Sequence, residues 1–143
     1  MGSLSAADLL GIPVRLHGIL LGRPSDLLLD ASARRVVGFV VESGDDVPRF
    51  LPFAASQPGE GAVAVASALM LLDDVAFYRK HGVSFRSLLG IRIERENALA
   101  GTLIDMHLNP AGDVVELEVD NDGVRSRIVA ADARFSPSAA TAA

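Results

Sequence analysis

The sequence predicts an all-β fold, in which two tandem small β-barrels are joined by a short helix and related by a pseudo-two-fold axis. Three observations support this prediction. Short apolar stretches alternate with glycine-containing turns, at the spacing of small barrels or compact sandwiches. The stretch Leu9–Val14 recurs in the second half of the chain as Leu88–Ile93. One helix-like segment lies between the two copies.

The repeat continues beyond this stretch without a gap. Further matches at the offset that relates Leu9 to Leu88 pair apolar residues, glycines and an aspartate. They are Leu20 with Leu99, Gly22 with Gly101, Asp26 with Asp105, Leu29 with Leu108, Val36 with Val115, and Val40 with Val119. With one residue fewer in the next turn, Arg49–Leu51 matches Arg127–Val129. This ordered series predicts two copies of one unit, at residues 5–72 and 84–136, with a linker at residues 73–83.

The first copy begins with a helical turn and continues with short strands. Ser5 and Asp8 have the spacing of a capping box, which satisfies free backbone N–H groups at a helix start, and Gly11 ends the turn. Residues 12–16 alternate between apolar and other side chains, the period of a half-buried strand. Four more strands are expected between turns rich in glycine, serine and aspartate. They are residues 27–29, 36–41, 50–51 and 63–65.

The linker and the second copy follow the same logic. The aspartates at 73–74 can cap a helix that runs to Lys80 and ends before Gly82. The strands of the second copy are expected at residues 91–93, 103–108, 114–119 and 128–129. Because this copy has no counterpart of Val63–Val65, we expect its barrel to be incomplete or to be finished by another segment. The small residues at 137–143 are expected to form a disordered tail.

The composition excludes several classes of protein. The chain of 143 residues has no cysteine, which excludes disulfide scaffolds and cysteine-ligated metal sites. Its net charge of −5 provides no basic field that would attract DNA or RNA. The longest apolar stretch, residues 62–72, is too short for a transmembrane helix, and the N-terminus lacks the pattern of an export signal. We therefore expect a cytoplasmic protein, and the arginine- and alanine-rich composition is typical of bacteria.

The order of these elements resembles the PRC-barrel family, which is named for the photosynthetic reaction centre. The elements of the first copy that carry the resemblance are Leu10–Val14, Gly22, Asp26–Asp30, Arg35–Val41 and Phe50–Pro52. Those of the second copy are Leu89–Ile91, Gly101, Asp105 and Val114–Val119. The resemblance implies small β-barrels that serve as binding or assembly modules, as in reaction-centre H subunits and ribosome-maturation factors. The family has no known catalytic residues, so the resemblance assigns none to this chain. The lack of a transmembrane segment and of a cofactor-binding partner domain argues against a photosynthetic role.

A comparison of the two copies predicts an apolar outer face on the first. Strand alternation places Glu116, Glu118 and Asp120 on the outside of the second copy. At the offset of the repeat, the first copy has apolar residues where these three acids and His107 stand in the second. These candidate interface residues are Leu28, Val37, Phe39 and Val41. Such a face is expected to be covered, either by the other copy or the linker helix within the chain, or by a second molecule.

Few residues of the sequence suggest chemistry. His17, His81 and His107 lack metal-ligand spacing on a helix, so surface or packing roles are expected, with no metal and no cofactor. Asp26 and Asp105 occupy matching positions, which favours a repeated structural hydrogen bond over paired carboxylates for acid–base catalysis. Residues 120–123 predict a turn rather than a calcium loop. No catalytic residue is therefore predicted.

One basic cluster is the best sequence-level indication of RNA binding. Arg34, Arg35 and Arg49 could together reach phosphate groups. Against this, the chain has one lysine, few aromatic residues and acidic residues throughout. The predicted function is a non-catalytic protein-interaction or assembly module, an adaptor whose partner is another protein or a second copy of itself. The alternative is an RNA-processing or ribosome-assembly factor, and no DNA partner is expected.

Overall fold

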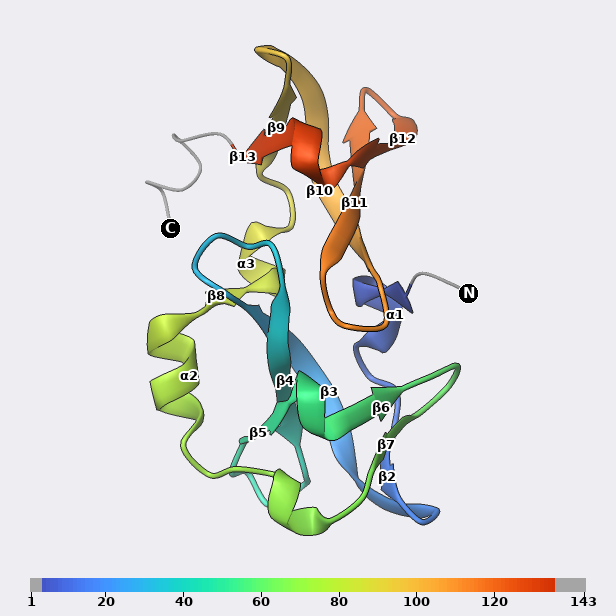
Figure 1. Ribbon diagram of the computed structural model, residues 1–143, viewed down its shortest axis with the longest axis vertical. Coiled ribbons are helices and arrows are strands. Elements are labelled where there is room, and N and C mark those ends of the chain that lie inside the picture. The colour runs from blue at the N-terminus through green and yellow to red at the C-terminus, as the bar shows by residue number, and fades with distance from the viewer. Residues whose placement is uncertain (1–3, 136–143) are drawn as a thin grey trace.

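The computed structural model describes residues 4–135 of the chain. Strands make up 53% of these residues and helices 18%, so the chain is mainly β, as predicted. Figure 1 shows two curled sheets, one above the other along the long axis of the molecule. Within the described residues, none of the helices is both long and apolar enough to cross a bilayer. The predicted tail at residues 137–143 lies outside this range.

The first sheet is built from seven strands. They are β2 (Val14–Leu16), β3 (Ile19–Leu29), β4 (Val36–Glu42), β5 (Arg49–Pro52), β6 (Ser56–Pro58), β7 (Val63–Val65) and β8 (Val83–Ser84). Their order is β5-β4-β3-β2-β7-β6, and β8 also pairs with β3. The long strands β3 and β4 form an antiparallel hairpin, whereas β2 and β7 are parallel. A short 3-10 helix, η1 (Phe53–Ala55), joins β5 to β6.

The second sheet is built from six strands. They are β1 (Leu4–Ser5), β9 (Arg92–Arg95), β10 (Ala98–Leu108), β11 (Val114–Asn121), β12 (Val124–Val129) and β13 (Ala133–Phe135). Their order is β12-β11-β10-β9-β13, and β1 also pairs with β10. The 3-10 helix η3 (Ala130–Asp132) leads from β12 into β13, which pairs directly with β9. The segment after β12 therefore adds an edge strand to this sheet, beside β9, where β7 lies beside β2 in the first sheet.

Three short helices in residues 4–135 begin at capping side chains. They are α1 (Ala6–Leu9), α2 (Val75–His81) and α3 (Phe85–Leu88), and a 3-10 turn, η2 (Ala68–Met70), precedes α2. The side-chain oxygens of Ser5, Asp74 and Ser84 accept the backbone N–H groups of the first turns of α1, α2 and α3. The helical turn after Ser5 and the linker helix capped by Asp74 are thus confirmed.

Each sheet includes a short strand that directly precedes the strands of the other sheet in the sequence. Strand β1 pairs with β10, so that Ser5 lies opposite His107. Strand β8 pairs with β3, so that Ser84 lies opposite Leu28. The helices α1 and α3 follow directly and lie against β10 and β3 (Figure 1). The two sheets are consequently linked by a reciprocal exchange of their leading segments.

The turns that precede β4 and β11 differ by one residue. Six residues separate β3 from β4, but five separate β10 from β11. The two turns also bond to each other, because Val36 N–H donates to Gly112 O and Val114 N–H donates to Arg34 O, both at 2.9 Å. The shorter turn reduces the offset between the copies by one residue in β4 and β11. A shift of one residue moves every side chain of a strand to the opposite face.

Most buried apolar side chains form one core shared by both sheets. The core includes Phe39 and Leu51 from the first sheet, and Leu117 and Ile128 from the second. The strand register agrees with the reduced offset, which matches Phe39 to Leu117, since Phe39 pairs with Leu27 and Leu117 pairs with Met106, the equivalent of Leu27. The two sheets therefore bury their inner faces against a common interior.

The structure corrects the predicted apolar outer face. Phe39 and Val41 are fully buried in the shared core, because the reduced offset matches them to Leu117 and Val119 rather than to the acidic residues. Leu28 does lie on the outer face, but it is buried in a small cluster with residues of β4, β5 and α2. The members of this cluster are Leu28, Val40, Phe50 and Val75, with Val37, Leu72 and Tyr78 at its edge. The linker helix thus covers this face within the chain, which was one of the expected alternatives.

We expect Phe39→Ala to lower the free energy of unfolding by about 3 to 5 kcal/mol, because it leaves a cavity in the shared core. Leu69→Ala is the matched control, since Leu69 is 85% exposed in η2 and its loss changes stability by about 0.5 kcal/mol or less. Chemical denaturation monitored by circular dichroism measures both values. Equal effects of the two substitutions would contradict the placement of Phe39.

Candidate functional site

Asp105 connects the second sheet to the N-terminal segment. The Ser5 hydroxyl donates to Asp105 Oδ2, and the Ala7 N–H donates to Oδ1 at 2.9 Å. The N–H of Met106, the next residue on β10, also donates to Oδ1, at 2.7 Å. The same Ser5 oxygen accepts the Asp8 N–H at 3.1 Å as the cap of α1. One carboxylate therefore fixes Ser5 and the first turn of α1 to β10.

Asp26 makes the same contacts in the first sheet, with partners at the equivalent positions of the repeat. The Ser84 hydroxyl donates to Asp26 Oδ2, and the Arg86 N–H donates to Oδ1 at 3.1 Å. The Leu27 N–H donates to Oδ1 at 2.8 Å. Asp26 is 5% exposed, and its three donors take the place of the water it loses on burial. Both aspartates make the repeated backbone hydrogen bonds that their matching positions predicted.

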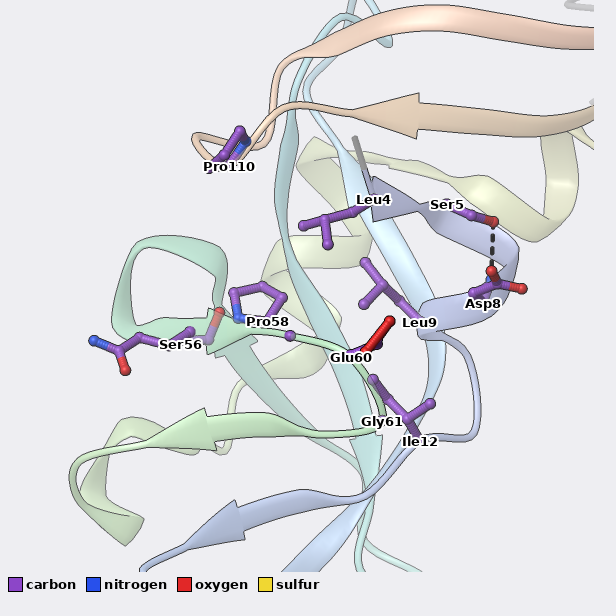
Figure 2. A pocket seen from close by; sticks show the side chains of 12 residues that line it. Leu4, Ser5, Asp8, Leu9, Ile12, Ser56, Pro58, Glu60, Gly61 and Pro110 are labelled. Atoms are coloured by element: carbon purple, nitrogen blue, oxygen red, sulfur yellow. Dashed lines mark hydrogen bonds between the residues drawn. The ribbon is translucent and has the colours of Figure 1, made fainter. Parts of the chain in front are cut away.

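An open groove lies between α1 and the loop that joins β6 to β7, as Figure 2 shows. Its volume is about 1010 Å³. Leu4, Leu9 and Ile12 line one wall, and residues 56–61 line the other. Pro110, from the turn before β11, closes one end. Sequence reasoning had no signal for this groove, because its walls come from segments that are distant in sequence.

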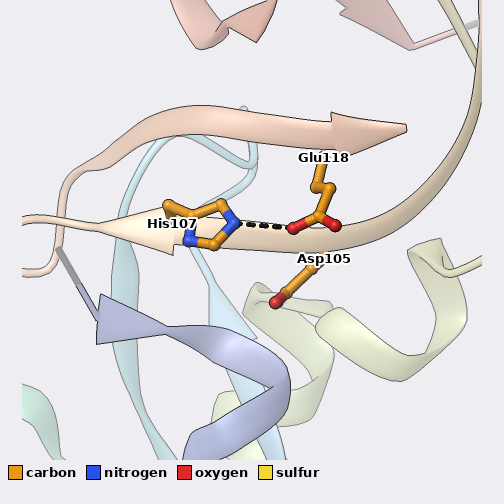
Figure 3. Close-up of side chains that lie close together, drawn as sticks. All are labelled: Asp105, His107 and Glu118. Carbon is orange, nitrogen blue, oxygen red and sulfur yellow. Dashed lines mark hydrogen bonds and ion pairs between the residues drawn. The ribbon is translucent and has the colours of Figure 1, made fainter. Parts of the chain in front are cut away.

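The outer face of the β10–β11 hairpin brings together three groups that can bind a metal ion: Asp105, His107 and Glu118 (Figure 3). The His107 Nε2 atom lies 3.0 Å from Glu118 Oε1, and one ligand atom from each residue lies within 4.8 Å of the others. The sequence predicted no metal ligands, because its histidines lack the spacing of a metal-binding helix. The available signal was an Asp-x-His pattern, which places both side chains on one face of a strand.

The other two histidines lie elsewhere. His17 is exposed in the turn between β2 and β3, where its backbone φ is 49°. His81 is exposed at the end of α2, where its ring packs against Phe77 with centroids 4.6 Å apart. Asp122 and Gly123 form the tight turn between β11 and β12, so the predicted turn is confirmed.

The three candidate arginines do not form a cluster. Arg34 and Arg35 precede β4 and Arg49 begins β5, where it pairs with Val41 at the far end of β4. The Arg34 Nη1 donates to Ala130 O at 2.9 Å, and the Arg35 Nε lies 3.1 Å from Asp113 Oδ1. All three guanidinium groups are engaged within the chain rather than directed at a common ligand.

Arg49 forms ion pairs with two aspartates. Its Nη2 lies 3.0 Å from Asp45 Oδ2, and its Nε lies 3.3 Å from Asp73 Oδ1. The hydrogen bond with Asp45 raises the pKa of Arg49 and is the main reason that the pKa of Asp45 is lowered. Arg49 therefore joins the β4–β5 loop to the start of the linker.

No protein-family model matches the sequence, and no curated protein matches it either.

We expect Asp26→Ala and Asp105→Ala each to lower the free energy of unfolding by about 1.5 to 3 kcal/mol, because each leaves three donors without their charged acceptor. Asp132→Ala, at an exposed position in η3, is the control and changes stability by about 0.5 kcal/mol or less. Urea denaturation measures these values. Aspartate variants as stable as the control would show that the repeated contacts are not structural.

The pKa of Asp113 is lowered from its ordinary value of 3.8, first by the hydrogen bond from the Asn109 side chain and then by the one from Arg35. A folded-state pKa below the unfolded value means that this carboxylate adds stability above its unfolded pKa, which is lost as pH falls through the folded pKa. We expect Arg35→Gln to raise the pKa of Asp113 toward 3.8. A carboxyl-carbon NMR titration measures this shift, and an unchanged pKa would contradict the contact.

Proposed function

We propose that the chain is a tandem PRC-barrel-like protein that acts in the cytoplasm as a non-catalytic protein-interaction or assembly module. Its two units are residues 5–72 and 84–136, joined by the linker at 73–83. The mainly β fold with two curled sheets supports this proposal. So does the recurrence, at equivalent positions of the two copies, of the contacts made by Asp26 and Asp105.

The observation that carries the proposal is the groove between α1 and the β6–β7 loop. Its volume of about 1010 Å³ lies at the upper end of the range for sites that enclose one small molecule, about 300 to 1,000 Å³. The side chains of Leu4, Leu9 and Ile12 project into it from one side and Pro58 from the other (Figure 2). An open site of this size and lining suits the apolar side chains of a protein segment.

The charges at the rim suggest the chemistry of that segment. Asp8 and Glu60 are both exposed beside the apolar lining. The whole chain carries a net charge of −5, so its field also favours a basic partner. Complementary charge increases the rate of association and selects the orientation of binding. The proposed ligand is therefore an apolar segment that is flanked by lysine or arginine.

The alternative, an RNA-processing or ribosome-assembly factor, has less support. Arg34, Arg35 and Arg49 lie apart and are engaged with acceptors of the chain itself. A strand of RNA would need a continuous basic surface with stacking aromatic groups.

A phage-displayed library of random linear peptides, selected on the immobilised full chain, tests the proposal. We expect enrichment of peptides that combine apolar residues with lysine or arginine. Ile12→Glu is expected to weaken binding of an enriched synthetic peptide by at least roughly tenfold, because it places a charge in the apolar lining. The control is Ile91→Glu, at the equivalent half-buried position of the second copy, which does not line the groove.

Fluorescence polarisation measures both affinities, and circular dichroism verifies that both variants are folded. Equal affinity of the peptide for the two variants would contradict the assignment of the groove. Failure to enrich any peptide, together with salt-sensitive binding of a single-stranded RNA oligonucleotide, would favour the alternative function.

A further inference from the structure

The outer faces of the two hairpins have diverged in one respect. Asp26, Leu28 and Val40 on the β3–β4 hairpin correspond, by strand register, to Asp105, His107 and Glu118 on the β10–β11 hairpin. In the first sheet, Leu28 and Val40 are covered by α2. In the second, two side chains that can ligate a metal replace these two apolar ones. The aspartate is common to both sheets, but the histidine and the glutamate occur only in the second.

The environment of this cluster favours a bound cation. Asp105 and Glu118 lie directly opposite each other on neighbouring antiparallel strands. Two carboxylates in this arrangement repel each other. The side chains are partly withdrawn from water, since the Glu118 side chain is 22% exposed and that of His107 is 6% exposed. The nearby Arg127 forms its ion pair with Glu116, which is outside the cluster, with Nη1 to Oε1 at 3.5 Å.

The cluster is also preorganised. Asp105 is held by the Ser5 hydroxyl and by the N–H groups of Ala7 and Met106, so its position is set before any ion binds. Oδ1 accepts both N–H groups, whereas Oδ2 accepts the Ser5 hydroxyl alone, so one lone pair of Oδ2 remains available for a metal. Hydrogen bonds from surrounding groups are the usual means by which proteins orient metal-ligating carboxylates.

We propose that Asp105, His107 and Glu118 bind one divalent transition-metal ion of the Zn²⁺ class. Imidazole nitrogen together with carboxylate oxygen is a donor set that suits Zn²⁺ and its first-row neighbours, whereas Mg²⁺ and Ca²⁺ prefer oxygen alone. The 3.0 Å between His107 Nε2 and Glu118 Oε1 is close to the separation of about 3.3 Å between two ligands on one tetrahedral zinc ion.

Three protein ligands leave at least one coordination position free. In proteins, a three-ligand zinc site is completed by water or by a group from a bound molecule. This site is independent of the proposed groove function, although Ser5 both lines the groove and donates to Asp105. Its test is therefore separate from the peptide experiment.

Titration of the full chain with Zn²⁺ in a calorimeter tests the proposal, with Co²⁺ as a spectroscopic probe. The test variant is His107→Leu with Glu118→Val, which installs the residues of the first sheet and leaves Asp105 with its structural contacts. The control is His81→Ala, which removes an exposed histidine at the end of α2. If the double variant does not fold, the isosteric Glu118→Gln replaces it.

We expect one equivalent of Zn²⁺ to bind to the native chain and to His81→Ala. We expect the affinity of the double variant to be lower by more than roughly 100-fold, and that of Glu118→Gln by at least roughly tenfold. Co²⁺ should give visible absorption bands with the native chain that the double variant lacks. The absence of saturable binding, its retention in the double variant, or its loss in His81→Ala would each overturn the proposal.

Discussion

The hydrogen bonds between Ser5 and Asp105, and between Ser84 and Asp26, hold the two sheets together. In each case the serine caps a short helix that leads into one sheet, and the aspartate lies on a central strand of the other. Each sheet includes a short strand from the segment that leads into the other sheet. We therefore expect that neither sheet can unfold without disrupting the other. The shared core has the same consequence, since both inner faces pack against a common interior.

Once this framework is fixed, the outer faces of the hairpins are free to differ. The first sheet places Leu28, Val40 and Phe50 outward and buries them under α2, where Phe50 stacks on Tyr78 with ring centroids 3.8 Å apart. The second has no such helical cover within the described residues and carries His107 and Glu118 instead. The groove beside α1 is lined by the loop that joins β6 to β7, where β7 separates β2 from β6. The proposed functions therefore lie where the two sheets differ.

Local pattern in the sequence predicted the β class and the caps, whereas features that depend on long-range register were missed. The β class, the caps at Ser5 and Asp74, and the backbone contacts of Asp26 could all be inferred from residue types and spacing. The faces of Phe39 and Val41 could not, because a turn shortened by one residue reverses the face of every following side chain. Glu118 meets His107 only through strand pairing, which the spacing of residues on one strand does not reveal.

Native-state hydrogen exchange in low concentrations of urea tests most directly whether the two sheets form one cooperative unit. The amides of Leu27 and Met106 are the best reporters, because each lies on a central strand. Each also donates to the aspartate of its sheet that binds the helix-capping serine. If the pairing of β1 with β10 and of β8 with β3 holds the sheets together, both amides become exposed to exchange with the same free energy and the same dependence on urea. Both values then equal those of global unfolding. Two distinct opening free energies, with one sheet exchanging while the other stays protected, would contradict this account.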